Sequence, residues 1–113
     1  MHEYSIVQAL VTQVEEQVRK HRASAVHLLE LRIGELSGVE VGLLKTAYDL
    51  FRAKTVCESA ELRIVSVKAQ WACRACGAEI PSGGPLRCPV CCEAARLVSG
   101  DEILLERLEL EVA

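Results

Sequence analysis

Four cysteines arranged as two matched pairs are the feature that most constrains what this chain can fold into. The pairs are Cys73-x2-Cys76 and Cys88-x2-Cys91. A gap of two residues lets both thiolates of a pair turn onto one ion, and two such turns complete the tetrahedral sulfur site that suits Zn²⁺. Four thiolates leave no position for a catalytic water, so the spacing predicts a structural zinc site. Iron stays open as an alternative metal.

The cysteines could instead form disulfides, a redox pair or ordinary buried thiols. The start of the chain, Met1 to Tyr4, has no basic segment followed by an apolar core, so we expect a cytoplasmic protein. A reducing compartment disfavours disulfides. Cys73 and Cys76 alone could form a redox motif, but the second matched pair favours metal binding. Cys57 and Cys92 are left over, and we expect each to be a small buried or half-buried thiol.

The composition narrows the class of protein further. The chain has 113 residues, which suits one compact domain or one domain with a small lobe. Its formal net charge of −3 argues against a protein that binds the phosphates of nucleic acid. Its apolar runs are shorter than the roughly 18 residues that indicate a membrane span. We therefore expect neither a nucleic acid nor a membrane among its partners.

The spacing of apolar residues predicts two helices and three strands around a loop-rich cysteine segment. The helices are expected at Ser5–His21 and Val41–Ala53, and the strands at Ala25–Gly34, Glu61–Val67 and Ile103–Val112. The predicted fold class is α+β: two helices packed on a small three-stranded, mostly antiparallel sheet, with an inserted zinc-ribbon-like lobe. Residues 1–67 and 101–113 are expected to form an α/β domain, and residues 68–100 the zinc-binding lobe. The strands on either side of the lobe are expected to pair antiparallel.

Three finer expectations concern individual side chains. Ser5 is placed to cap the first helix, with Gln8 in the capping-box position. Strict alternation puts His27 on the same strand face as Leu29, Leu31 and Ile33. The buried face of the second helix is expected to hold Leu43, Leu44, Ala47, Tyr48, Leu50 and Phe51.

The histidine directly after the initiator methionine is a second candidate for metal chemistry. The terminal amine of Met1, the amide nitrogens of His2 and Glu3, and the His2 imidazole can close fused chelate rings around one ion. Four nitrogens in a plane suit Ni(II) or Cu(II). A terminal histidine is more often simply solvated, and the residues by themselves leave that alternative open.

Motifs spread over the whole chain match one known family. They are the start Met1-His2-Glu3-Tyr4-Ser5, the segment Ile33-Gly34-Glu35-Leu36-Ser37, the two cysteine pairs, and Ser99-Gly100-Asp101-Glu102-Ile103 before a Leu/Glu-rich strand. In these motifs the chain resembles the HypA/HybF family of hydrogenase nickel-incorporation proteins. It departs from that family at Cys92, where glycine is usual, and at Ser59, in a stretch that often contains glycine.

The resemblance implies a nickel metallochaperone that is not an enzyme, with structural zinc and transient nickel. Family members deliver Ni(II) to the [NiFe]-hydrogenase large subunit with the GTPase HypB. Some also serve urease, which makes urease accessory proteins further candidate partners. The family's nickel site carries over onto Met1, His2 and Glu3, with Glu40 at the position of an acidic residue that sometimes lies nearby. Its zinc ligands carry over onto Cys73, Cys76, Cys88 and Cys91.

The alternative function is a zinc-ribbon adaptor that binds protein or nucleic acid. The lobe between Lys68 and Gly100 has four basic and two acidic residues. This bias is too weak to favour nucleic acid.

Overall fold

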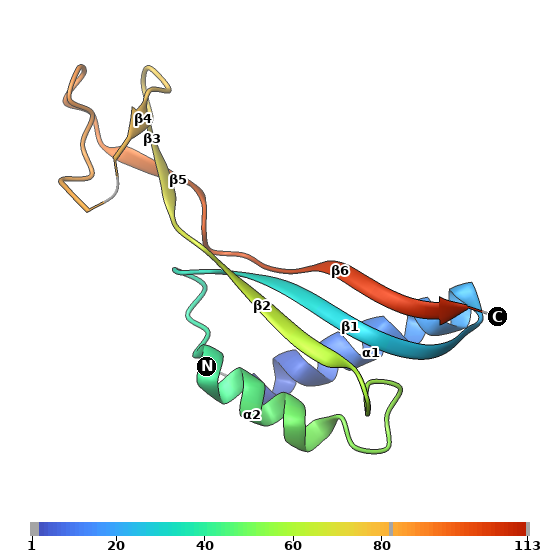
Figure 1. Cartoon of the computed structure of the whole chain (residues 1–113). Coiled ribbons are helices and arrows are strands. Elements are labelled where there is room, and N and C mark those ends of the chain that lie inside the picture. Colours follow the sequence, from blue (N-terminus) through green and yellow to red (C-terminus); the bar gives the residue numbers. More distant parts are fainter. Residues whose placement is uncertain (1–2, 82, 113) are drawn as a thin grey trace.

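The molecule is elongated, with two small sheets joined at a narrow waist (Figure 1). The computed structural model describes residues 3–81 and 83–112. It measures 56 × 27 × 16 Å, and its radius of gyration is 18.0 Å. A compact domain of this length would have a radius of about 13 Å. The helices gather at one end of the molecule and the paired cysteines at the other.

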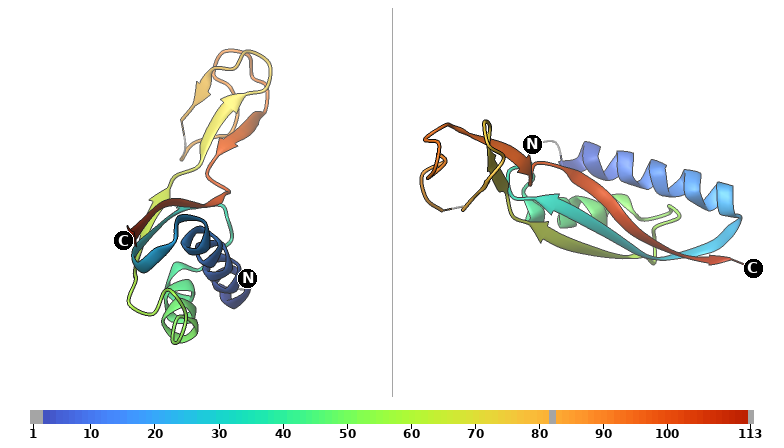
Figure 2. Two further views of the ribbon diagram at one scale, coloured as in Figure 1. Left: turned by 90° about the vertical axis from the view of Figure 1, so that its right-hand side faces the viewer. Right: turned by 90° about the horizontal axis from the view of Figure 1, so that it is seen from above.

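The larger sheet has the order β2-β1-β6, with β1 (Ala23–Gly34) in the centre. β2 (Glu61–Val67) pairs parallel with β1, and β6 (Ile103–Val112) pairs antiparallel with it. α1 (Glu3–His21) and α2 (Val41–Phe51) cover one face of this sheet (Figure 1, Figure 2). The predicted fold class is confirmed, and three of the four strand pairings in the described residues are antiparallel.

The prediction that the strands flanking the lobe pair with each other is wrong. These strands are β2 and β6, and β1 lies between them. β1 carries buried side chains on both faces, with Leu28 on one and Leu29 and Leu31 on the other. A strand that is apolar on both faces is best protected from water in the centre of a sheet.

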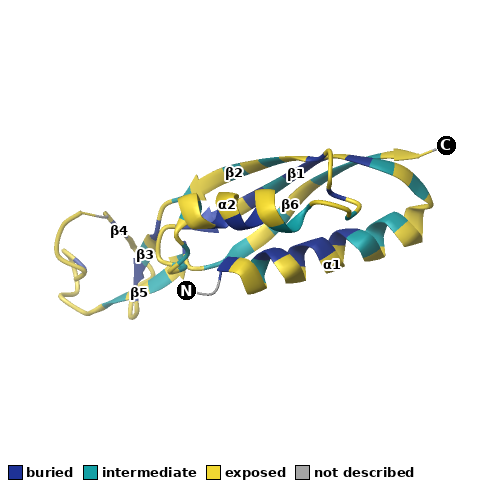
Figure 3. Ribbon diagram, turned by 90° about the horizontal axis from the view of Figure 1, so that it is seen from below, coloured by how far each residue is buried: buried dark blue, intermediate teal, exposed yellow. Residues whose placement is uncertain are grey.

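An apolar core fills the space between the helices and the larger sheet (Figure 3). Its buried members on named elements are Val7, Leu10, Val11 and Val14 of α1, Val26, Leu29, Leu31 and Ile33 of β1, and Leu44, Ala47 and Tyr48 of α2. The members from α1 recur every three or four residues, which places them on one side of the helix. No helix in the described part of the chain is long and apolar enough to cross a membrane.

β1 contains a bulge that strict alternation did not predict. Its register with β6 shifts between Val26 and Leu28, so His27 is the extra residue. The bulge turns Val26 toward the core and leaves His27 exposed, with Nε2 3.1 Å from a carboxylate oxygen of Glu111. The expectation that His27 lies on the same strand face as Leu29 is therefore wrong.

Both helices differ from their predictions at the ends. α1 begins at Glu3, so Ser5 lies inside the helix and is not its N-cap. α2 ends at Phe51 rather than Ala53. An early start for α1 places the side chain of Glu3 against the beginning of α2, where it is buried.

Two leucines of α2 that we expected in the core are exposed. The exposed fraction is 58% for Leu43 and 73% for Leu50. α2 packs through Leu44, Ala47 and Tyr48, and each successive residue of a helix turns by about 100°. Leu43 and Leu50 consequently lie on one flank of α2, beside the packed face.

The waist is a close crossing of three backbone segments. A Cβ on Gly34 would lie 2.1 Å from the carbonyl carbon of Gly100, and one on Gly100 would lie 2.5 Å from the Cα of Ala69. Gly100 also has a φ of +113°, a conformation that suits glycine. The Glu35 carboxylate accepts a hydrogen bond of 2.9 Å from the Ala69 amide. Both chain segments that lead to the lobe are thus tied to the end of β1.

Candidate metal centre

A second three-stranded sheet supports the cysteine turns. Its order is β4-β3-β5, formed by Glu79–Ile80, Gln70–Cys73 and Ala95–Ser99, and both pairings are antiparallel. Its small core consists of buried Cys73, Ile80 and Cys88 with half-buried Trp71 and Ala95. Two of the three buried members are cysteines, so this sheet has little apolar material of its own.

The first cysteine pair sits on the turn that follows β3. Cys73 is the last residue of β3 and is buried. The Gly77 amide donates to the Cys73 carbonyl at 3.1 Å, which closes the turn, and Gly77 has a φ of +75°. The amides of Ala75 and Cys76 point at the Cys73 sulfur, at 3.3 and 3.4 Å. Amides that donate to sulfur favour the thiolate, which is the form that binds metal.

The second pair repeats this arrangement on a turn before β5. The Cys92 amide donates to the Cys88 carbonyl at 2.9 Å, and the Cys91 amide lies 3.4 Å from the Cys88 sulfur. The Cys88 amide donates to the Glu93 carbonyl at 2.9 Å, so the chain on both sides of the turn is paired. Both turns have the amide-to-carbonyl bond that closes the turn and the bond from the amide of the second cysteine to the sulfur of the first, as expected for two halves of one site.

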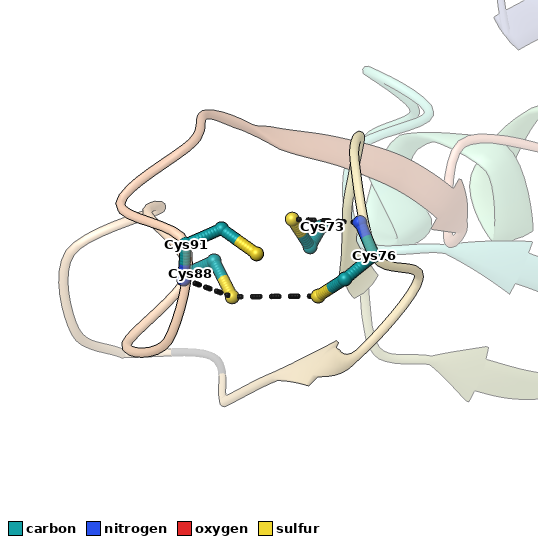
Figure 4. A group of neighbouring side chains, drawn as sticks. All are labelled: Cys73, Cys76, Cys88 and Cys91. Atoms are coloured by element: carbon teal, nitrogen blue, oxygen red, sulfur yellow. Dashed lines mark hydrogen bonds between the residues drawn. The ribbon is translucent and has the colours of Figure 1, made fainter.

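The four sulfur atoms converge between the two turns (Figure 4). All lie within 4.8 Å of one another, and the Cys76 and Cys88 sulfurs are 3.8 Å apart. A tetrahedron with Zn–S bonds of about 2.3 Å has sulfur atoms about 3.8 Å apart. The cluster therefore fits a structural zinc ion, with Cys73 and Cys88 on the buried side and Cys76 and Cys91 exposed.

Protonation of the cluster is shaped by the turns and by crowding. The pKa of Cys73 is lowered to about 7, mainly by the hydrogen bond from the Cys76 amide, and desolvation opposes part of this lowering. The pKa of Cys91 is raised to about 12, first through its hydrogen bond with Cys76 and then through desolvation. A bound cation would favour the thiolate form of all four cysteines, including Cys91, because it attracts each of them. Protons compete with the cation for the sulfurs as the pH falls.

Comparison with known proteins separates a metallochaperone from an unrelated zinc ribbon. Residues 1–110 match the family model described as hydrogenase/urease nickel incorporation, metallochaperone, HypA. This chain belongs to the HypA family. The hydrogenase maturation factor HypA of Nitrosospira multiformis is 44% identical over 112 residues, with 97% of each chain covered. That of Aquifex aeolicus is 40% identical over 114 residues, with 99% of each chain covered.

Solved structures from the HypA family have the same fold. The solution structure of the Ni metallochaperone HypA from Helicobacter pylori aligns with a TM-score of 0.75 and 30% identity, and both chains are fully covered. A second HypA solution structure aligns with a TM-score of 0.82 and 30% identity, covering 100% of this chain and 98% of the other. HypA is a family of nickel metallochaperones for hydrogenase maturation, so the family prediction is confirmed.

The predicted nickel residues of this HypA family member are only partly described. Met1 and His2 lie outside the described residues. The Glu3 side chain is 8% exposed, and its Oε2 accepts a hydrogen bond of 3.2 Å from the Glu40 amide. Glu40 is the N-cap of α2, and its own side chain is exposed and makes no cap hydrogen bond. The structure thus brings Glu3 and Glu40 together.

The role of the Glu3 carboxylate at the start of α2 was not predicted. The first amides of a helix lack partners within the helix, and an acidic side chain near them is favourable. Glu3 supplies that side chain from another helix, 37 residues away in sequence. A signal of this kind is absent from local sequence patterns, which describe only neighbours along the chain.

The two cysteines outside the cluster differ from each other. Cys57 is fully buried, as expected, and burial raises its pKa to about 11. Cys92 is exposed, contrary to the expectation of a buried or half-buried thiol. Its amide is used by the second turn, which holds its φ at +61° and directs its side chain outward.

Proposed function

We propose that this protein is a nickel metallochaperone that binds one Ni(II) at its N-terminus and delivers it for maturation of [NiFe]-hydrogenase. The observation that carries the proposal is the direct contact between Glu3 and Glu40, two of the four expected nickel residues. The family match over residues 1–110 supports it. The proposed donors are the Met1 amine, the amide nitrogens of His2 and Glu3, and the His2 imidazole, a set that suits Ni(II).

The two carboxylates have different roles in this proposal. Glu3 is buried, and its Oε2 bonds the Glu40 amide, so it positions the start of α1 against the start of α2. Its main-chain nitrogen is the atom proposed to reach nickel. The exposed Glu40 carboxylate assists at the rim of the site, where a water-accessible ligand can exchange as the metal is handed on.

Zinc has a separate role, which is to hold the lobe together. We assign Cys73, Cys76, Cys88 and Cys91 as its ligands, and their four sulfurs fill a tetrahedral coordination sphere. Soft thiolates retain zinc, while an exposed nitrogen site binds nickel loosely enough for release. This division separates a permanent structural ion from a transported one.

The proposed setting is the cytoplasm, where the protein works with the GTPase HypB and the hydrogenase large subunit. Delivery to urease accessory proteins is a second destination, favoured because the matching family is described for urease as well as hydrogenase. Residues 1–67 and 101–113 form the nickel-binding domain in this proposal, and residues 68–100 form the zinc lobe.

Calorimetric titration with Ni(II) of zinc-loaded protein with its native N-terminus tests the proposal. Wild type is expected to bind one Ni(II), and His2→Ala is expected to abolish that binding because both the imidazole and the chelate ring are lost. The imidazole has an ordinary pKa of about 6.5 and must be neutral to bind. Nickel affinity should therefore fall steeply as the pH drops below about 6.5.

Two further proteins complete that experiment. A chain extended by one residue before Met1 displaces the amine and should also bind nickel weakly. His27→Ala removes an exposed histidine far along β1 and should leave nickel binding unchanged. Equal nickel affinity in wild type, His2→Ala and the extended chain would eliminate the N-terminal site.

A further inference from the structure

Strand β6 is a long, free edge of the larger sheet. It pairs with β1 on one side, and no strand in the described residues pairs with its other side (Figure 2). Its ten residues, Ile103–Val112, make it the second-longest strand. A free edge presents a row of backbone N–H and C=O groups that can pair with another strand.

A bulge in β6 makes its two halves symmetric. The register with β1 passes from Leu31↔Leu105 to Glu30↔Arg107, so Glu106 is an extra residue. Arg107 faces away from the helices like its partner Glu30, and Glu106 reaches Arg32 on the same outer face at 3.7 Å. Two adjacent residues of β6 therefore point to one face, and the alternation reverses between them.

Because of this reversal, the inward-facing and outward-facing positions of β6 are symmetric about the midpoint between Glu106 and Arg107. The residues on the helix-covered face, which pack against the core, are Ile103, Leu105, Leu108 and Leu110. The residues on the outer face are Leu104, Glu106, Arg107 and Glu109. Reading outward from the midpoint between Glu106 and Arg107, the two directions give the same order of faces.

We propose that β6 pairs antiparallel with β6 of a second copy of this chain, about a two-fold axis between Glu106 and Arg107. Each Glu106 then lies opposite the Arg107 of the other copy, which gives two pairs of opposite charge. Leu105 lies opposite Leu108, and Ile103 opposite Leu110, on the helix-covered face. Such an interface is closed, because each copy uses the same strand, and it joins the two larger sheets into one.

The charges select this register over its neighbours. A shift by one residue in either direction places Glu106 opposite Glu106 or Arg107 opposite Arg107. It also places leucines of one face opposite charged residues of the other. Like charges directly opposite each other destabilise a strand pair, and opposite charges stabilise it. Charges and a bulge can also protect an edge from pairing, but here the two signs lie where a two-fold axis brings them together.

The neighbouring surface of α1 is compatible with a second copy. A hollow of about 250 Å³ lies beside β6. Its lining residues are Gln13 and Gln17 of α1 and Leu105, Glu106, Arg107 and Leu108 of β6. The two leucines are only half-buried at this edge, so a second strand would cover them further. The glutamines are uncharged and can both donate and accept hydrogen bonds, so they do not repel their own copies.

Sedimentation equilibrium of the full-length, zinc-loaded protein tests this inference, which is independent of the nickel proposal. Wild type is expected to form a dimer and no larger assembly. Glu106→Arg and Arg107→Glu each replace two attractive pairs by two repulsive ones and should weaken the dimer by about tenfold. The double variant exchanges the charges and should restore the dimer.

Matched variants separate this interface from others. The double variant loses both the Arg32–Glu106 and the Arg107–Glu109 contacts within one chain, so recovery of the dimer would come from the contact between copies. Position 104 lies opposite Glu109 of the second copy in this register, so Leu104→Lys adds an attractive pair and should strengthen the dimer. Val65 lies on the opposite edge strand, β2, so Val65→Lys should not change the stability of the dimer. A wild type that stays monomeric at millimolar concentration, or a dimer insensitive to the charge at 106 and 107, would overturn the inference.

Discussion

Cys92 holds a backbone conformation that residues with a Cβ adopt only at a cost. Its φ is +61°, and the hydrogen bond from its amide to the Cys88 carbonyl keeps it there. Gly77 occupies the equivalent place after the first cysteine pair with a φ of +75°. The left-handed region costs a residue with a Cβ roughly 1–2 kcal/mol, and glycine avoids that cost.

Cys92→Gly is therefore expected to stabilise the lobe by about 0.5–1 kcal/mol, once the greater flexibility of glycine in the unfolded chain is subtracted. The exposed thiol contributes little packing that could be lost. The measurement is the midpoint of chelator-induced unfolding, followed by Trp71 fluorescence. Cys92→Ala is the control, since it removes the thiol but keeps the Cβ, and it should give no gain. A midpoint for Cys92→Gly at or below that of Cys92→Ala would contradict the strain argument.

The loop from α2 to β2 depends on one buried hydroxyl. The Tyr48 hydroxyl donates to the Ala60 carbonyl at 2.9 Å, and Arg52 donates to the same oxygen at 2.9 Å. The pKa of Tyr48 is raised to about 12, first by burial of the hydroxyl and second by the nearby Cys57. The folded protein therefore retains the Tyr48 proton at a pH where an exposed tyrosine, with a pKa of about 10, would lose it.

Tyr48 is expected to make the free energy of unfolding fall at alkaline pH. Its folded pKa is raised, so its stabilisation is complete below pH 10 and is lost as the pH rises toward 12. The loss should reach about 1–2 kcal/mol. Urea titrations at several pH values would measure it. Tyr48→Phe starts about 1 kcal/mol less stable because it lacks the hydroxyl. Its decline should be shallower, and parallel declines in the two proteins would contradict the assignment.

Helices and strands were predictable where apolar spacing runs without interruption. β2 and β6 have the predicted bounds, because alternating or β-branched residues define them locally. The bulge at His27 and the exposure of Leu50 were not predictable, because both depend on which partner lies opposite. The strand order was not predictable for the same reason, because it depends on packing between distant segments. β1 lies between β2 and β6 because it is apolar on both faces, and this favours the central position only once the helices cover one face of the sheet.

At the scale of the whole molecule, the convergence of the four cysteines was predictable and the contact between Glu3 and Glu40 was not. Cysteines that can share one metal ion are constrained along the chain, since a gap of two residues lets both thiolates of a pair, such as Cys73 and Cys76, reach the same point. The contact between Glu3 and Glu40 joins separate helices, and only the assembled fold brings them together. The waist was predictable in part. The motif around Gly34 and Glu35 was visible in the sequence, but its close crossing with Gly100 was not.

Removal of zinc should unfold the lobe and leave most of the helical structure in place. The lobe core contains Cys73 and Cys88, both bound to zinc in our assignment, with Ile80 as its other buried member. The core of the larger sheet contains no residue of β3, β4 or β5. Structural zinc contributes roughly 10–16 kcal/mol of apparent binding energy in small peptides, which is more than such a small core can replace.

Two optical signals separate the ends of the molecule. Trp71 is the single tryptophan and lies on β3, so its fluorescence reports on the lobe. Circular dichroism reports mainly on α1 and α2, which lie outside the lobe. A chelator should shift the Trp71 emission to the red while helical ellipticity persists, and Cys73→Ser should reproduce this result. Cys92→Ala, next to the cluster, should retain zinc and keep the wild-type spectrum. Loss of the helical signal together with the Trp71 shift would mean that the waist, through Glu35 and Gly100, makes the two ends one cooperative unit.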